Sequence, residues 1–555
     1  MLNGKLALEK TIKENIKKAL HEIASEKKVD FETEPAIELE VPKDIKFGDI
    51  SANTAMKACK AFGMKPRELA ALISDKLPQS RYIDKTEIAG AGFINFYISA
   101  EWLYEQIEEI VDKKTEYGSI MPEVSKSINV EFISANPTRP LHIGNARGGA
   151  IGDVIANIYK KAGWNVTKEF YLNDAGNQIV KFGESLYARF RQIEDAEFPM
   201  PENAYLGEDI KEAACSYYNE NPKAMGMSKD ELTPLLTEYA LNNNIKNLHR
   251  VAELYGIDYD VWFKESELHK SGAVSKAIEL LRKKGAVYEK DGAVWFRATD
   301  YGCDKDEVLV RANGIPTYYA ADIAYHLNKL TVRKFDKAVN VWGADHHGHV
   351  LRLKMALKAA GVEPERLHIV LMQLVHLVKG SESVRISKRR GDMVTLDELL
   401  SEVSTDAVRY IFNCTTPSSH LDFDMDLALK QSNDNPVFYV QYAHARICSI
   451  LRNVHEYDCA AELEKLKADS EVALIKRLTD YSKEIKNAAE EYDPSKITKY
   501  AYEIASLFHS FYNACRVKNE NDHGLTNARL MLVKSCGYVL KSILEVLGVS
   551  APESM

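Results

Sequence analysis

The fold is decided by the stretch SINVEFISANPTRPLHIGNARGGAIGDVIANIYKKAGWNVTKEFYL, residues 127–172. Its residues 128–134 and 166–172 are rich in β-formers, and between them, over residues 144–162, apolar residues recur on one helical face. This order predicts a strand, a helix and a second strand. Because a strand that crosses over through a helix returns in the same direction, we expect a parallel sheet in an α/β fold.

Further strand patterns at residues 337–342 and 367–378 extend this prediction along the chain. The section between the two halves, residues 183–298, is charged and helix-rich, and we interpret it as a helical insertion. We therefore expect a central domain over residues 123–430 that carries this insertion.

The two ends of the chain differ from this centre. Residues 1–122 mix helical patterns, at 6–24 and 51–77, with a strand-like stretch at 87–98 that contains a glycine turn, which indicates a small α/β module. Residues 431–555 are helical almost throughout, and apolar side chains recur there on one helical face. The sequence thus predicts a multidomain α/β protein with an α-helical bundle at its C-terminal end.

Composition excludes several classes of protein. The formal net charge of −9 does not fit a general nucleic-acid binder, which neutralises phosphates with excess Lys and Arg, so any RNA contact needs local basic patches. Eight cysteines stand without a Cys-x-x-Cys pair, which argues against a zinc ribbon and a disulfide framework. No apolar run reaches the ~18 residues of a membrane span, and no signal segment opens the chain, so we expect a cytoplasmic protein.

A first candidate site lies at Ala135–Asn145, between the first strand and its helix. A helix N-terminus offers free N–H groups and a partial positive charge, and Gly144 lets a ligand approach the backbone, so phosphate is the natural guest. His142 could donate a hydrogen bond to a phosphoryl oxygen as its charge grows. A loop histidine that caps a helix is the alternative, and it is the commoner case for His-x-Gly alone.

A second candidate site, Arg385–Gly391, gathers basic residues in a glycine-flanked turn after the strand at 367–378. Thr395 and Glu398 then form the capping-box pattern of a helix start. An anion would relieve the repulsion within the turn, and Lys388 could neutralise a pyrophosphate leaving group. A solvated basic turn is the alternative when such a run occurs alone.

Together the two candidate sites resemble the signatures of the class I aminoacyl-tRNA synthetases, His-Ile-Gly-His and Lys-Met-Ser-Lys-Arg. Asn145 stands in place of the second histidine, and Arg385 and Ile386 replace Lys and Met, whereas Lys388 is retained. An asparagine keeps a hydrogen-bond donor but cannot become a cation, so the division of labour between His142 and Asn145 stays open. The resemblance implies a Rossmann-like parallel-sheet catalytic core in which both signatures serve one nucleotide.

The activated amino acid is indicated by candidate carboxylates. A planar, five-donor guanidinium is best met by bidentate acceptors, and open α/β sheets bind ligands near their strand ends. Glu131 and Asn136 flank the nucleotide loop, while Tyr318 and Asp322 share a face at i, i+4 spacing if their segment is helical. A phenol and a carboxylate on a solvated helix are the alternative.

Longer stretches are similar to the arginyl-tRNA synthetases in particular and are spread over essentially the whole chain. They are residues 131–138, 171–178, 318–322, 343–349, 435–446 and the ending 547–555. The resemblance therefore implies a ligase of protein biosynthesis that acts on arginine.

The same resemblance implies a role for each candidate residue. Catalysis would fall to His142, Asn145 and Lys388. ATP would contact Pro140, Leu141, His142, Ile143, Gly144, Asn145, Ser387, Lys388 and Arg389. Arginine would be held by Ser134, by Glu131, Tyr318 and Asp322 at its guanidinium, and by Asn136, Asp345 and His346 at its amino and carboxylate end.

The partners follow from this reaction. Arginine and ATP with Mg²⁺ would form an adenylate, and the arginyl group would pass to the terminal ribose of the arginine tRNA, on the 2′-hydroxyl by the class rule. The N-terminal module would touch the elbow of the tRNA and the helical bundle would read its anticodon, with Tyr442 and Arg446 as contacts. We expect no tightly bound cofactor, no zinc or other metal site and no membrane partner, and we expect a monomer.

Two rival interpretations come from other classes. Asp345-His346-His347 superficially resembles the Asp-His-His phosphoesterases, which bind two metals, but the further aspartate motifs of that family are missing from the sequence. A tRNA-binding relative with an inactive site is the non-enzymatic rival. Asn145 favours it, and retention of His142, Lys388, Glu131 and Asp322 opposes it.

Overall fold

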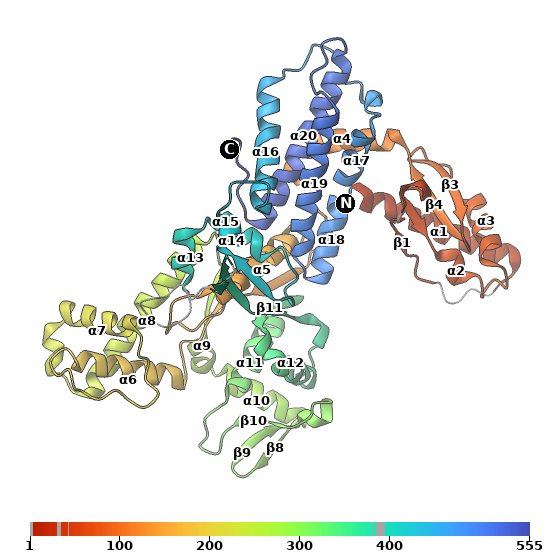
Figure 1. Ribbon diagram of the computed structural model, residues 1–555. Coiled ribbons are helices and arrows are strands. Elements are labelled where there is room, and N and C mark those ends of the chain that lie inside the picture. The colour runs from red at the N-terminus through yellow and green to blue at the C-terminus, as the bar shows by residue number, and fades with distance from the viewer. Residues whose placement is uncertain (1–3, 30–34, 43, 381, 384–393) are drawn as a thin grey trace.

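The computed structural model describes residues 4–29, 35–42, 44–380, 382–383 and 394–555. Figure 1 shows a central sheet below a helical bundle, with an N-terminal module standing to one side of the bundle and two lobes extending below the sheet.

The central sheet is parallel and has five strands. They are β5 (Ser127–Glu131), β6 (Asn165–Leu172), β7 (Val261–Lys264), β11 (Lys337–Gly343) and β12 (Leu367–Met372), arranged in the order β12-β11-β5-β6-β7. The first of them along the chain therefore lies in the middle, between β6 and β11. Such a reversal of strand order opens a crevice at the carboxyl ends of the strands, where open α/β sheets bind ligands.

Helix α5 (Ile143–Lys161) makes the crossover from β5 to β6, as the sequence predicts. Its apolar residues, among them Ile151, Val154 and Ile158, are fully buried. The helix is covered by the sheet on one side and by α14, α18 and α20 on another, so it lies at the centre of the largest hydrophobic core. The N-terminus of α5 is consequently held in one place at the crevice.

Strand β5 is shorter than the sequence pattern suggests. The prediction of a strand to Ser134 is wrong, because the chain leaves the sheet after Glu131. Ile133 and Ser134 have φ angles of 65° and 46°, and the Ser134 N–H donates to the Phe132 carbonyl at 2.9 Å, which makes a γ-turn. Positive φ at a β-branched residue is strained and is found mostly at functional sites.

The predicted strand at 367–378 is divided in two. After β12 the chain bends at Gln373, and β13 (Val375–Lys379) enters another sheet, between β14 (Glu382–Ser383) and the parallel β15 (Leu421–Asp424). The main chain of Gln373 is bonded on both sides: its N–H donates to the Pro417 carbonyl and its carbonyl accepts from Arg147. These distant partners hold the bend.

The N-terminal module contains a four-stranded antiparallel sheet of order β1-β2-β4-β3. Its elements are α1 (Gly4–Lys27), β1 (Leu39–Glu40), β2 (Ile50–Ala52), α2 (Thr54–Ala58), α3 (Pro66–Lys76), β3 (Ile83–Ala89) and β4 (Phe93–Ile98). The helix expected over residues 51–77 is interrupted, because its first residues pair as β2 and Pro66 opens a new helix at its first position.

Two lobes arise from the central part of the chain. One consists of α6 (Asn177–Arg191), α7 (Glu208–Glu220) and α8 (Lys229–Leu254). The other is built from α9 (Glu265–Lys270), α10 (Ala273–Lys283), β8 (Val287–Lys290), β9 (Ala293–Phe296) and β10 (Glu307–Val310). Strand β7 lies between them in sequence and returns to the edge of the central sheet, a contribution that its four residues do not signal in the sequence.

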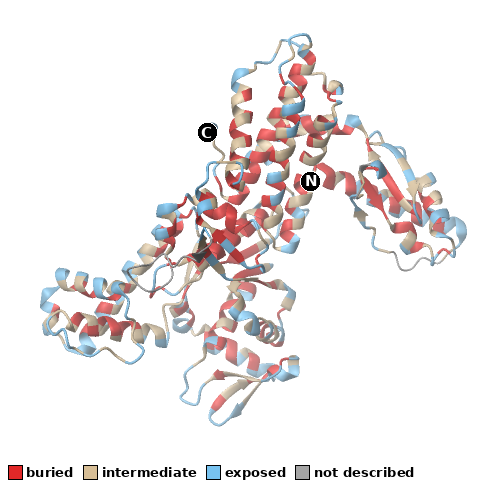
Figure 2. Cartoon of the chain, viewed as in Figure 1, coloured by how far each residue is buried: buried red, intermediate tan, exposed pale blue. Residues whose placement is uncertain are grey.

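The remaining helices complete the core and the bundle. Helices α11 (Tyr318–Leu327) and α12 (His347–Ala360) belong to the core, and α13 (Leu396–Glu402), α14 (Thr405–Phe412) and α15 (Met425–Leu429) lead to the bundle. The bundle comprises α16 (Pro436–Asn453), α17 (Asp469–Leu478), α18 (Tyr481–Glu491), α19 (Ser495–Ala514) and α20 (His523–Leu547), with α4 (Ala100–Lys113) packed on α20. Figure 2 shows the buried faces of these helices turned toward one another.

Short helical turns link these elements. They are η1 (Ile45–Phe47), η2 (Lys114–Glu116), η3 (Pro222–Gly226), η4 (Ala298–Tyr301), η6 (Ala344–His346), η7 (Pro364–Arg366) and η8 (Leu463–Lys465), together with the π-helical turn η5 (Asn328–Val332). Across the part of the chain that the structure describes, no helix has the length and apolar character needed to cross a membrane.

Candidate active site

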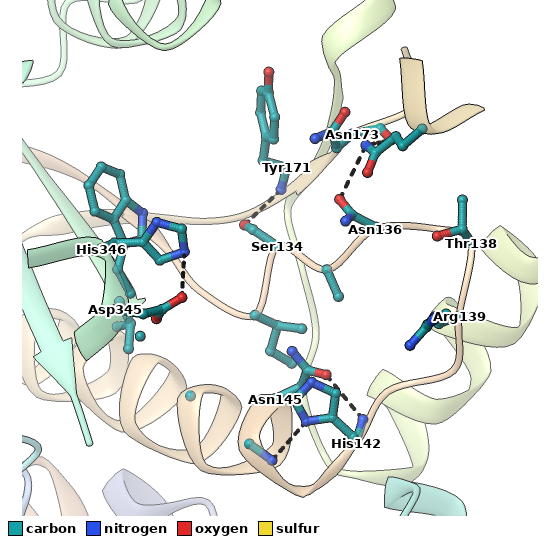
Figure 3. Close-up of a pocket in the computed structure, with 18 of the residues that line it drawn as sticks. Ser134, Asn136, Thr138, Arg139, His142, Asn145, Tyr171, Asn173, Asp345 and His346 are labelled. Carbon is teal, nitrogen blue, oxygen red and sulfur yellow. Dashed lines mark hydrogen bonds and ion pairs between the residues drawn. The ribbon is translucent and has the colours of Figure 1, made fainter. Parts of the chain in front are cut away.

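One cavity of about 1450 Å³ opens at the carboxyl ends of the central strands. The structure brings most of the predicted site residues together on its wall (Figure 3). Those that line it are Glu131, Ser134, Asn136, Pro140, His142, Gly144, Asn145, Tyr318, Asp322, Asp345 and His346.

The other predicted ATP contacts do not line this cavity within the described residues. Leu141 and Ile143 are buried, and their main chains bind the segment that follows the second candidate site: the Ile143 N–H donates to the Val394 carbonyl at 3.1 Å, and the Leu396 N–H donates to the Leu141 carbonyl at 2.8 Å. Ser387, Lys388 and Arg389 lie outside the described residues. The chain that follows them is thus fastened to the loop of the first candidate site.

His142 caps the N-terminus of α5. Its Nδ1 accepts a hydrogen bond from the Gly144 N–H at 3.1 Å, so the proton of the neutral ring must be on Nε2. Burial, and then the charge of Arg139, lower the pKa of His142 below its ordinary value. The ring is therefore neutral at pH 7 and offers an Nε2–H donor.

Asn145 completes a capping box with His142. Its Oδ1 accepts from the His142 N–H at 3.0 Å, which leaves the amide N–H₂ as a donor at the cavity. Gly144 between them has no room for a side chain, because a Cβ would stand 2.9 Å from Cε1 of His142. The loop thus places an imidazole donor and an amide donor side by side, while the N–H groups of Ile143, Gly144 and Ala146 are already bonded to Val394 and His142.

Asp322 lies at the other end of the cavity, on α11. Its Oδ2 is 2.8 Å from Nε2 of His349, and its side chain is partly exposed. Tyr318 lies one turn earlier on α11 and is 48% exposed, so the helix spacing expected from the sequence is present. The carboxylate and the phenol are both accessible to a ligand.

Glu131 has a partner that the sequence did not suggest. Its Oε2 is 2.5 Å from Nζ of Lys329, which is fully buried, and it also accepts from Nδ2 of Asn340 at 2.8 Å. Lys329 lies in the π-helical turn η5 and is 198 residues away in the chain. The negative charge of Glu131 is therefore already balanced by a fixed ammonium group.

The hydrogen bonds continue beneath the cavity. Nδ2 of Asn340 also donates to Nε2 of His326, whose Nδ1 donates to the Asp322 carbonyl at 2.8 Å. Burial, and then the charge of Lys329, lower the pKa of His326 to about 3, so the ring is neutral. This network joins Glu131 on β5 to Asp322 on α11.

A second buried carboxylate, Glu169 on β6, lies beside Lys329. Arg333 and Tyr325 both donate to it. Burial alone would raise the pKa of Glu169, but the Arg333 hydrogen bond and the Lys329 charge outweigh burial and lower it. Glu131, which lines the cavity, and Glu169 behind it are thus both paired with cations, which leaves Asp322 as a carboxylate open to a charged ligand.

The loop after β5, the end of β6 and the start of α6 form the rest of the cavity wall near Asp322. The Tyr171 N–H donates to Oγ of Ser134 at 3.1 Å, and Oδ1 of Asn136 accepts from Nε2 of Gln178 at 3.4 Å (Figure 3). Burial, and then Glu265, raise the pKa of Tyr171, so its hydroxyl stays protonated. Tyr171, at the end of β6, and Gln178, at the start of α6, fall in the stretch 171–178 that resembles the family, but their residue types alone did not single them out as site residues.

Asp345 and His346 lie exposed in η6 at the rim of the cavity, where Nε2 of His346 is 3.7 Å from Oδ2 of Asp345. Among the residues that the structure describes, no three His, Cys, Asp or Glu side chains converge as metal ligands do. A two-metal phosphoesterase site is therefore not formed at Asp345-His346-His347 by these residues.

A smaller cavity of about 470 Å³ lies on the bundle. Tyr442 and Arg446 of α16 line it together with Tyr512 of α19 and the terminal Ser554 and Met555. The Arg446 guanidinium stands 4.2 Å from the ring centroid of Tyr512 and 5.9 Å from that of Tyr442. Aromatic rings beside a cation form a surface on which an unpaired base could stack.

Comparisons with known proteins agree along the chain. Three family models match: the arginyl tRNA synthetase N terminal domain over residues 10–98, the catalytic domain of class I (R) tRNA synthetases over 106–417, and the DALR anticodon binding domain over 440–555. The domain boundaries expected at residues 122 and 430 stay predictions.

Curated relatives and solved structures match over nearly full length. An arginine–tRNA ligase from Caldanaerobacter subterraneus subsp. tengcongensis is 49% identical, covering 98% of both chains, and one from Acetivibrio thermocellus is 48% identical, covering 100% of both. The arginyl-tRNA synthetase structure from Thermus thermophilus, 24% identical, has the same fold, with a TM-score of 0.78 over 98% of this chain and 100% of that one.

The methionyl-tRNA synthetase of Mycobacterium tuberculosis, 12% identical, shares the fold less closely, with a TM-score of 0.51 over 76% of this chain and 89% of that one. The catalytic-domain model matches more than half of the chain, and the curated relatives are nearly half identical to it throughout. On this evidence the chain belongs to the arginyl-tRNA synthetases, a class I family.

Proposed function

We propose that the cavity between β5, β11 and α11 holds ATP and L-arginine together and joins them into arginyl-adenylate. As a member of its family the chain is an enzyme, an arginine–tRNA ligase. The observation that carries the assignment of its site is that the N-terminus of α5 and the carboxylate of Asp322 line one cavity.

The phosphates of ATP belong at the N-terminus of α5. The Nε2–H of His142 and the amide of Asn145 are donors without a charge of their own, and donors fixed in this way stabilise charge that develops in a transition state. Lys388, predicted from the sequence, would add a cation for the leaving pyrophosphate. Mg²⁺ enters with ATP as part of the substrate.

The guanidinium of arginine belongs at Asp322 and Tyr318. Asp322 has an oxygen free of His349, and the two cations beside Glu131 and Glu169 are taken up by these carboxylates. Glu131 then acts as a fixed polar wall more than as a free charge. Ser134, Asn136, Asp345 and His346 surround the space between the guanidinium end and α5, where the substrate's amino and carboxylate groups would lie.

The chemistry follows from this placement. A carboxylate oxygen of arginine attacks the α-phosphorus, the bond from that phosphorus to the β-phosphate oxygen breaks, and pyrophosphate leaves. The 2′-hydroxyl of the terminal ribose of the tRNA then attacks the arginyl carbonyl carbon, and AMP leaves. No covalent intermediate with the enzyme is needed, because the fixed donors act by position.

The tRNA would lie along the bundle, with an anticodon base at Tyr442 and Arg446 and the elbow at the N-terminal module. The basic and aromatic lining of the smaller cavity supports this placement. We also propose that the protein acts in the cytoplasm and as a monomer. Sedimentation of the free enzyme and of its tRNA complex would test the monomeric state.

The test is a charging assay with total tRNA and one labelled amino acid at a time. Arginine should be attached in an ATP-dependent manner, and lysine should not, because a single ammonium cannot make the paired contacts of a guanidinium. Charging with another amino acid, or none with arginine, would remove the proposal. Asp322→Asn should raise the KM for arginine with little change in the KM for ATP.

A further inference from the structure

Arg147 is a fully buried cation in the second turn of α5. Within the described ranges it forms no ion pair, and one of its nitrogens, Nε, is buried without a hydrogen-bond partner. Arg409 is equally buried, yet its guanidinium is paired with Asp153 at 2.5 Å. A buried charge without a counter-ion is costly, so Arg147 calls for an explanation beyond packing.

The partners of Arg147 are neutral oxygens on two loops. Its Nη1 donates to the Gln373 carbonyl at 2.9 Å, and its Nη2 donates to the Thr416 carbonyl at 3.2 Å and to Oγ1 of Thr415 at 3.3 Å. Burial lowers its pKa to about 10, so it stays protonated at neutral pH. The planar guanidinium reaches both loops at once.

One of these loops is a wall of the active-site cavity. Met372, Gln373 and Leu374 line the cavity where the chain passes from β12 to β13. The Gln373 N–H donates to the Pro417 carbonyl at 3.0 Å, so both polar main-chain groups of Gln373 already have partners within the protein. Arg147 and Pro417 therefore fix the bend of this wall.

The wall faces a definite part of the cavity. It lies against Gly148, one turn of α5 beyond Gly144, where a Cβ would stand 3.7 Å from Cε of Met372. If the phosphates are bound at His142 and Gly144, the nucleoside can extend toward this wall. Gly148 and Met372 both line the cavity and offer an apolar surface there, against which a purine can pack.

We propose that Arg147 is a positioning residue for the nucleoside half of ATP, acting through the bend at Gln373 that it holds against the cavity. The inference rests on the proposed function and deepens it. An apolar side chain could fill the same space, but it could not bind the carbonyls of Gln373 and Thr416 together. The buried charge is retained because the adenosine wall depends on that double contact.

The test compares Arg147→Lys with the wild-type enzyme in tRNA charging. Lysine keeps the charge but cannot span both carbonyls. We expect the KM for ATP to rise about tenfold, and inhibition by AMP to weaken about as much, because both depend on the nucleoside wall. The KM for arginine and inhibition by pyrophosphate should stay within about twofold. Thr415→Val, which removes the weakest contact, should raise the KM for ATP about threefold.

Arg409→Lys is the matched control. It alters an equally buried arginine on α14 that is paired with a carboxylate and does not line the cavity. It should lower the melting temperature without changing the KM for ATP by more than about twofold.

An unchanged KM for ATP in Arg147→Lys, an equal rise in the KM values for ATP and arginine, or the same pattern in Arg409→Lys would overturn the inference. Failure of the proposed function is seen separately, as a wild-type enzyme that does not charge tRNA with arginine.

Discussion

The helix cap made by His142 also determines which ring nitrogen is left as a donor. As a helix cap it accepts the Gly144 N–H through Nδ1, and this acceptance fixes the tautomer that presents Nε2–H to the cavity. Asn145 accepts the His142 N–H in return, which leaves its amide donors at the cavity. A second histidine is therefore not required at position 145 for the loop to be closed and for a donor to remain.

Gly144→Ala tests this arrangement. Because its new methyl group would stand 2.9 Å from Cε1 of His142, the ring must leave its cap. We expect kcat/KM for ATP to fall about a hundredfold, the loss typical of one misplaced transition-state donor. Gly348→Ala on α12, where a Cβ meets nothing within 4 Å, is the control and should be near wild type. Equal activities of the two variants would contradict the role of the cap.

His326 makes stability depend on pH. Its pKa falls from an ordinary 6.5 to about 3 in the folded protein, so between these values the unfolded chain binds a proton that the folded chain does not. This contribution to stability is complete above pH 6.5 and is lost as the pH falls below it. At pH 5 the loss amounts to about 2 kcal/mol.

Urea unfolding of the wild type and of His326→Gln measures this. Glutamine can still accept from Asn340 but cannot take up the proton. We expect the free energy of unfolding of the variant to fall less between pH 7 and pH 5. Parallel pH profiles for the two proteins would show that His326 is not the group responsible.

The π-helical turn η5 is the element that aims Lys329 at Glu131. Lys329→Met would leave the Glu131 carboxylate buried with Asn340 as its remaining described partner, so the free energy of unfolding should fall by about 3–5 kcal/mol. Adding Glu131→Gln removes the unpaired charge and should restore part of the loss. If Glu131→Gln lowers the free energy of unfolding of Lys329→Met by as much as it lowers that of the wild type, Glu131 and Lys329 are not coupled.

Helix α16 presents the predicted tRNA contact. Tyr442→Ala should raise the KM for tRNA about tenfold or more, since base stacking on an aromatic ring contributes about 1–3 kcal/mol, while the KM values for arginine and ATP stay the same. Tyr502→Ala on α19 is the control, because Tyr502 is exposed but does not line the smaller cavity. Equal effects of the two variants on the KM for tRNA would assign Tyr442 to packing.

Across the whole chain, features set by consecutive residues could be predicted from the sequence, whereas features set by contacts between distant residues could not. The parallel sheet and α5 could be predicted because strand and helix periodicities are written in consecutive residues, and this fold is confirmed. The bend at Gln373 could not, because it depends on Arg147, 226 residues away. The early end of β5 could not be predicted either, because residues 132–134 continue the β-rich pattern of the strand and only the γ-turn at Ile133 takes them out of the sheet.

The candidate site shows the same division. Residues in recognisable motifs, such as His142 and Asp322, could be placed at one cavity because parallel strands end at a common edge. Lys329, which balances Glu131, had no signal: a lysine in a helical pattern predicts an exposed side chain, and the π-helical turn that directs it inward is set by tertiary packing.

In the proposed mechanism, arginine and ATP occupy one continuous cavity. The most direct test is steady-state inhibition by a non-hydrolysable arginyl-adenylate analogue, measured against each substrate in turn. Because the analogue would span the N-terminus of α5 and the carboxylate of Asp322, it should compete with both ATP and arginine. Inhibition that is noncompetitive toward either substrate would contradict the shared cavity.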